Sequence, residues 1–199
     1  MDVLRMLAVY SHLLVLMVAV GGMALTEYAV LGVAQGGNAA LLTQAPRMVV
    51  WALAGLWVTG TVIVGLDTQF AWPIILSKPK LLAKLSVVVL MTGNGVYLHQ
   101  RVLPWLRSSS RAAGAEVSMK RAAIVSGALS AACWVYAVFL GVAKPLGSTW
   151  GYAGFMGGFA VLLGVALVVA CRLVPPRLTR LQGSRAVSPL LEPARKRVA

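Results

Sequence analysis

The sequence predicts an all-α integral membrane protein, a bundle of about five transmembrane helices. Two observations lead to this fold class. Hydrophobic residues make up 59% of the 199 residues and charged residues only 12%, with a mean hydropathy of +0.83, whereas soluble domains carry about 25% charged residues. The hydrophobic residues also fall in blocks of about twenty, the length that crosses a bilayer, with charged segments between them. Composition and block length therefore point to the same fold.

Five segments are long and apolar enough to span a membrane. The first could be taken for a signal peptide, but its apolar stretch is longer than an h-region of about 7–15 residues, and no convincing small-residue cleavage site follows it. We therefore predict one transmembrane domain over residues 1–173 and a basic tail over residues 174–199. The expected spans are 4–33, 48–66, 81–103, 122–143 and 150–173.

The distribution of Lys and Arg predicts the orientation. With five spans, thirteen basic residues lie on the side of the tail and five on the other side. Because cytoplasmic loops are enriched in Lys and Arg, we expect the N-terminus outside and the C-terminus in the cytoplasm, in a bacterial-type inner (plasma) membrane. The five basic residues expected outside are Arg5, Lys78, Lys80, Lys84 and Lys144.

The net charge of +13 would suggest a nucleic-acid partner in a soluble protein. Here membrane orientation explains the charge, and no aromatic-basic module accompanies it, so we expect no nucleic-acid binding. The tail beyond Leu173 contains four prolines among its basic residues. We predict that it is disordered and attracted to anionic inner-leaflet lipids, at about 1 kcal/mol per basic residue near the surface.

The segment 67–80 is too short to span the bilayer. It contains Phe70, Trp72 and Pro73, followed by three aliphatic residues. Aromatic residues are enriched where a membrane meets water. We therefore predict an outer interfacial segment anchored by its aromatic side chains.

Ionisable and amide side chains inside the spans mark where chemistry is expected. Such groups cost about 2.5–3.5 kcal/mol on insertion scales and mark the bundle interior or a site. The first span contains His12 and Glu27, and the third contains Lys84, Asn94 and His99, whereas the other three have nothing ionisable in their middles. Any functional site is therefore expected between the first and third spans.

The spacing of these residues predicts two levels. His12 and Glu27 are fifteen positions apart, as are Lys84 and His99, so each pair falls within about 60° on its helix. Both helices run in the same direction, so His12 and Lys84 lie toward the outside, and Glu27 and His99 lie toward the inside. We expect the inner pair to form a proton or charge relay.

His12 can be interpreted as a metal or haem ligand, or as a hydrogen-bonded proton carrier. His12 and His99 are not expected to hold one haem together, because they differ in depth by about 15 Å at 1.5 Å per residue. Structural interpretations remain open as well: Lys84 and Arg5 would reach for the outer headgroups, and His99 would pair with Glu27 at the inner interface.

Two stretches resemble known membrane families. His12-Leu-Leu-Val-Leu-Met-Val-Ala-Val-Gly21-Gly22, in which a glycine pair follows the histidine after nine residues, resembles the opening helix of CopD-type copper-resistance membrane domains. Lys84, Asn94 and Pro104 fall at ten-residue steps, similar to a later helix of the same family. The HemJ-type protoporphyrinogen oxidases share the first-helix histidine and a lysine that opens a later helix. The resemblance covers about the first 105 residues.

Two positions depart from these patterns. Ala19 stands where CopD domains often carry Trp, and Asn94-Gly95 stands where HemJ-type proteins have His-Gly. The second departure weakens the case for tetrapyrrole oxidation as such. The resemblance still implies haem, tetrapyrrole or copper.

We therefore expect haem b, or a related redox cofactor, between the first and third spans. His12 would be the axial and metal ligand, Lys84 would pair with a propionate or an anionic substrate, and Asn94, His99 and Glu27 complete the predicted cofactor-binding residues. A redox role would call for a redox partner in the membrane.

Two alternatives stay open, and the sequence does not decide whether the chain is an enzyme. One is a copper permease without redox chemistry, in which the ion passes His12 and soft methionine ligands. The other is a structural membrane subunit. The methionines considered as ligands are Met17, Met23, Met91 and Met156.

Overall fold

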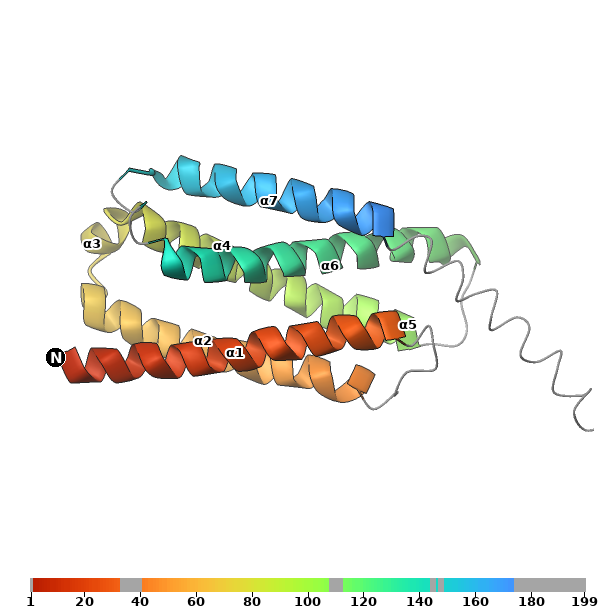
Figure 1. The fold of residues 1–199 in the computed structure, drawn as a ribbon, viewed down its shortest axis with the longest axis horizontal. Helices are drawn as coiled ribbons and strands as arrows, with labels where there is room; N and C mark the ends of the chain where they lie inside the picture. The colour runs from red at the N-terminus through yellow and green to blue at the C-terminus, as the bar shows by residue number, and fades with distance from the viewer. Residues whose placement is uncertain (1, 33–40, 108–112, 144–145, 147–148, 174–199) are drawn as a thin grey trace, which may run out of the picture.

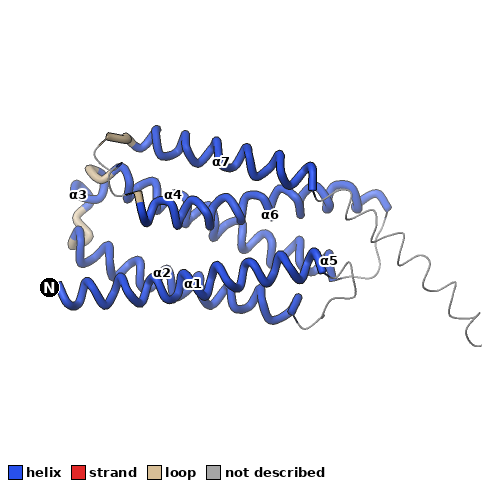
Figure 2. Tube along the Cα trace, in the orientation of Figure 1, coloured by secondary structure: helices blue, strands red, loops and turns tan. Residues whose placement is uncertain are grey.

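A computed structural model describes residues 2–32, 41–107, 113–143, 146 and 149–173. These residues form helices and short connections, with no strand among them (Figure 2). Five of the helices are long and apolar enough to cross a membrane. The predicted all-α membrane bundle is therefore confirmed.

Several helices extend beyond the predicted apolar segments, whereas the last begins two residues after its predicted start. The fourth long helix, for example, begins nine residues before the predicted start at position 122, because hydropathy marks the lipid-embedded part while good helix formers continue the helix past it. The long helices are α1 (Asp2–Gly32), α2 (Leu41–Thr68), α4 (Pro79–Tyr97), α6 (Ala113–Val142) and α7 (Tyr152–Leu173), and the short ones are α3 (Trp72–Leu76), the π-helix η2 (Leu98–Val102) and α5 (Leu103–Arg107). The predicted basic tail, 174–199, lies outside the described residues.

The long helices form two groups (Figure 1). α1 and α2 pack against each other as an antiparallel pair, and α4 packs against α6 and α7. One core joins the groups, because buried residues from both belong to a single cluster that includes Ala19, Leu56, Val87, Cys133 and Phe155. We call the end where α1 begins the N-terminal end; α2 ends there, α4 and α7 begin there, and α6 ends there.

The three-helix group is held by side-chain hydrogen bonds. Asn94 on α4 donates from Nδ2 to the Ser126 carbonyl at 2.9 Å and accepts from Ser126 Oγ at 2.8 Å. The Tyr136 hydroxyl on α6 donates to the carbonyl of Phe155 on α7. Interhelical hydrogen bonds of this kind support association in lipid, where no hydrophobic force acts between helices.

The connection between α2 and α4 turns sharply at the N-terminal end. Gln69 and Phe70 adopt positive φ angles of 49° and 57°, a conformation that is uncommon outside glycine. The Phe70 ring folds back over Gly65, where an added Cβ would lie 2.8 Å from two ring carbons. Gly65 therefore permits this turn, which leads into α3.

The segment around α3 has one buried side and one exposed side. Ile75 is buried, whereas Phe70 is 57% exposed and Trp72 is 72% exposed. This arrangement fits the predicted interfacial segment, since aromatic side chains at the end of a span settle at the headgroup level.

Large apolar side chains cover the outside of the bundle. Trp51 is 78% exposed and Val142 is 74% exposed, and exposed hydrophobic residues occur along every long helix. A soluble monomer rarely exposes contiguous apolar surface on this scale. The chain is therefore a multi-pass membrane protein whose outer surface faces lipid.

Candidate functional site

His12 lies on α1 and turns toward α2. Its Nδ1 is 2.7 Å from the hydroxyl oxygen of Thr59, which in turn donates to the carbonyl of Gly55 at 2.8 Å. A hydroxyl has a single proton to donate, and that proton is used on Gly55. When the Thr59 proton is on Gly55, Nδ1 donates to Thr59 and the lone pair of the neutral ring lies on Nε2.

Nε2 of His12 is accessible. Nε2 makes no hydrogen bond with a described residue. In the described part of the chain, every buried side-chain nitrogen or oxygen has a hydrogen-bond partner. Nε2 must therefore reach a surface of the bundle. A histidine whose one nitrogen is fixed by a hydrogen bond while the other presents a lone pair is arranged as metal-binding histidines are.

Gly60 gives the imidazole its place against α2. A Cβ added at Gly60 would lie 3.5 Å from Cε1 and 4.0 Å from Nδ1 of His12, which is ordinary van der Waals contact. The ring therefore lies over Gly60, next to Thr59, with room for no more than a methyl group between them. A larger, branched side chain at this position would press on the ring.

Lys84 on α4 shares this level of the bundle. Its ammonium is close enough to interact electrostatically with the His12 ring, although the side chain is half-buried. Among the described residues it has no acidic partner, because the ion pair formed there joins Arg5 to Asp67, and its charged neighbour is Lys80. His12 and Lys84 thus interact through charge, although α1 and α4 make few contacts with each other.

A second hydrogen bond joins the two helix groups near this level. The indole N–H of Trp57 on α2 donates to the Thr92 hydroxyl on α4 at 3.0 Å, and Thr92 donates to the Val88 carbonyl at 2.7 Å. This bond holds α2, and with it Thr59 and Gly60, in place against α4. It therefore helps to hold His12 near Lys84.

The other predicted site residues lie away from His12. Asn94 bonds to Ser126 on α6 through both ends of its amide. His99 is exposed in η2, fifteen residues and about 22 Å of helix rise beyond Lys84. Glu27 belongs to α1, but its side chain lies outside the described residues, so its pairing with His99 stays a prediction.

Arg5 has a partner within the protein. Its Nε lies 2.6 Å from Asp67 Oδ1 and its Nη2 lies 3.2 Å from Oδ2, so the start of α1 is tied to the end of α2 by a two-pronged ion pair. Lys78 adds a bond from Nζ to the Asp67 carbonyl at 3.3 Å. The suggestion that Arg5 only reaches for headgroups therefore does not describe its contacts.

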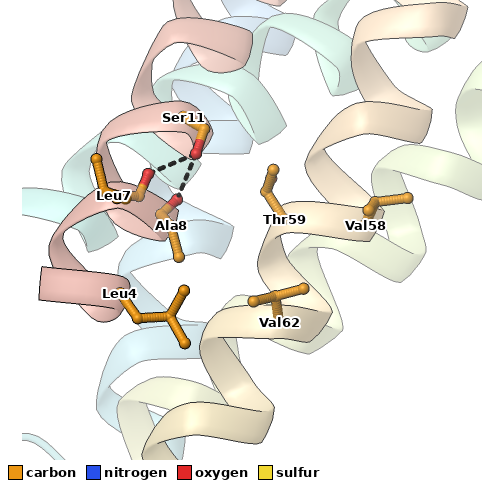
Figure 3. A pocket seen from close by; sticks show the side chains of 7 residues that line it. All are labelled: Leu4, Leu7, Ala8, Ser11, Val58, Thr59 and Val62. Atoms are coloured by element: carbon orange, nitrogen blue, oxygen red, sulfur yellow. Dashed lines mark hydrogen bonds between the residues drawn. The ribbon is translucent and has the colours of Figure 1, made fainter. Parts of the chain in front are cut away.

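An open groove of about 260 Å³ lies between α1 and α2 at the N-terminal end (Figure 3). Its walls are almost entirely apolar, and Thr59 lies at its inner side, so the groove reaches the residue that orients His12. The side chains that line it are Leu4, Leu7, Ala8, Ser11, Val58, Thr59 and Val62.

His12 was predicted to be a metal ligand, and the described side chains that could join it in binding a metal are few. Within the described ranges, no three or more His, Cys, Asp or Glu side chains gather as a metal site. Of the methionines considered as copper ligands, Met17 is 66% exposed on the outside of α1 and Met91 is buried in the core cluster.

Sequence reasoning missed the contribution of α2. Thr59 and Gly60 contact His12. The second span contains nothing ionisable at its middle, so the sequence does not predict that it contributes to the site. The signal available was the pair Thr59-Gly60, a hydroxyl next to the smallest residue within an apolar run. Small and hydroxyl residues mark close helix contacts in membranes.

Comparisons with known protein families, with characterised proteins and with solved structures gave no match to this chain.

Proposed function

We propose that this membrane protein holds haem b, or a closely related redox cofactor, with His12 as the axial ligand beside α2 and α4. The observation that carries the proposal is the chain of hydrogen bonds from His12 Nδ1 to Thr59 and on to Gly55. It fixes the tautomer that presents Nε2 as a ligand. It also accounts for a costly imidazole at a depth where an apolar residue would insert more favourably.

The single histidine favours haem over a bare copper ion. A porphyrin supplies four nitrogen ligands itself, so the protein has to add only one or two axial ligands. A bare ion needs several protein ligands at one place, and the described residues around His12 do not provide a group of three. When bound, the haem iron would supply one-electron transfer.

Lys84 supports an anionic cofactor. Its half-buried ammonium lies at the level of His12 without an acidic partner among the described residues. A buried or half-buried charge is costly unless it is paired. A propionate, or the carboxylate of an anionic substrate, would provide that pairing while His12 holds the metal.

We place this site near the outer face of the membrane. The basis is the excess of Lys and Arg on the side of the C-terminal tail, thirteen residues against five. A reporter that works only in the cytoplasm should be active when fused after Arg197 and inactive when fused within 69–77. The reversed pattern would place the His12 site on the cytoplasmic side.

An absorption spectrum of the purified chain, produced with ample haem, tests the proposal. The wild type should show a Soret band, and His12→Leu should lose it while insertion and expression stay intact. His99→Leu is the matched control, because it removes an exposed histidine at the opposite end of α4 and should keep the band. A wild type without bound haem, or a His12→Leu variant that binds it equally well, would refute the proposal.

A further inference from the structure

The groove between α1 and α2 opens toward the lipid. Leu4, Leu7, Val58 and Val62 line it, and each is at least 46% exposed. Leu4 and Leu7 come from α1, and Val58 and Val62 come from α2 (Figure 3). In a bilayer this groove is in contact with lipid chains and not with water.

Both hydroxyl groups in the groove already donate hydrogen bonds to backbone carbonyls. Ser11 donates to the Leu7 carbonyl one turn earlier on α1, and Thr59 donates to the Gly55 carbonyl on α2. The remaining lining side chains are aliphatic. The lining side chains therefore offer no N–H or O–H donor to a ligand, and the groove suits a hydrocarbon chain better than a polar molecule.

Charged side chains lie where the groove reaches the N-terminal end. Leu4 lies next to Arg5, whose guanidinium binds Asp67. Lys78 is exposed and spends one of its three N–H donors on the Asp67 carbonyl. Lys78 is also the N-cap residue of α4, whose first turn has no acidic residue. The positive end of the helix dipole therefore adds to the positive charge of Lys78.

We propose that the groove binds one acyl chain of a phospholipid whose anionic headgroup contacts Lys78. The apolar lining accounts for the chain, and the exposed Lys78 ammonium, which has two N–H donors beyond its bond to Asp67, accounts for the negative headgroup. The bound chain covers the side of Thr59 that faces the groove, and so shields the hydrogen bond that orients His12. The lipid site is independent of whether a cofactor binds at His12.

Native mass spectrometry of the full chain, released from bilayers of equal phosphatidylcholine and phosphatidylglycerol, tests this proposal. The wild type should retain phosphatidylglycerol preferentially. Ala8→Phe and Val58→Phe each place a ring in the groove and should abolish retention. Val58 is 66% exposed, so its replacement keeps the test available if Ala8→Phe fails to fold. Ala24→Phe, the same change at an exposed position on α1 outside the groove, should retain lipid as the wild type does.

Lys78 is tested separately from the groove. Lys78→Gln should lower the preference for phosphatidylglycerol about fivefold, as expected for one basic residue at an anionic surface, and Lys78→Arg should keep it. Equal retention of the two lipids by the wild type would overturn the proposal. So would unchanged retention in both groove variants, an equal loss in Ala24→Phe, or an unchanged preference in Lys78→Gln.

Discussion

His12 and Asn94 are both polar side chains in apolar helices, but the protein uses them differently. Asn94 bonds to Ser126 through its amide oxygen and its amide nitrogen, and both bonds join α4 to α6. His12 bonds to α2 through Nδ1 alone and leaves Nε2 accessible, with the Lys84 ammonium near enough to act electrostatically on the ring. A polar residue within a membrane span thus stabilises helix packing when its polar atoms are all hydrogen-bonded to a neighbouring helix. It becomes a candidate ligand when an oriented lone pair is left over.

Of the changes considered, Thr59→Val should separate the His12 site from the Asn94–Ser126 contact most clearly, through its effect on haem affinity. It keeps the shape of the side chain but removes the acceptor that orients His12 Nδ1. Loss of an orienting hydrogen bond to a metal-binding histidine typically costs about 10–100-fold in affinity. Haem titration followed at the Soret band should show this loss, whereas Ser126→Ala, which removes a hydroxyl from the packing region, should leave haem affinity unchanged. Equal affinities in the two variants would mean that Thr59 does not orient a ligand.

Asn94→Leu should have the complementary effect. It removes both bonds to Ser126 and leaves a buried hydroxyl without its acceptor, so the free energy of unfolding should fall by about 1–3 kcal/mol. Unfolding in mixed micelles measures this change. The Soret band should remain in the fraction that stays folded. A variant that loses haem without losing stability would move Asn94 from the packing region into the cofactor site, as the resemblance to CopD-type domains implied.

Lys84→Gln should have a smaller effect on the cofactor. The change removes a charge that attracts an anionic group but leaves the bond from His12 to the metal. Half-exposed charge pairs contribute up to about 1 kcal/mol, so haem affinity should fall by about fivefold at low salt. Added salt should reduce the difference between variant and wild type, because it screens the wild-type attraction. A difference that does not depend on salt would indicate a packing role for Lys84.

The sequence predicted the bundle well because lipid imposes a simple rule. Every span must be helical and about twenty residues long, so apolar blocks reveal the crossing helices. It also predicted a common level for His12 and Lys84, because two helices that run in the same direction keep their residues in step. The partners of these residues were harder to predict. Thr59 of α2 and Ser126 of α6 are neutral and small, and hydropathy does not separate them from other residues in their spans.

The contact between Trp57 and Thr92 should give the smallest effect. It joins α2 of the α1–α2 pair to α4 of the three-helix group at 3.0 Å, but the core cluster holds the same groups together through many apolar side chains. Interhelical hydrogen bonds in membrane proteins average about 0.6 kcal/mol. Trp57→Phe keeps a ring and removes the indole N–H, so the free energy of unfolding should fall by about that amount. Thr92→Val should cost a similar amount, and the double variant little more than either, because both changes break one bond. Fully additive losses would show that the two side chains act separately and that packing alone joins the two groups.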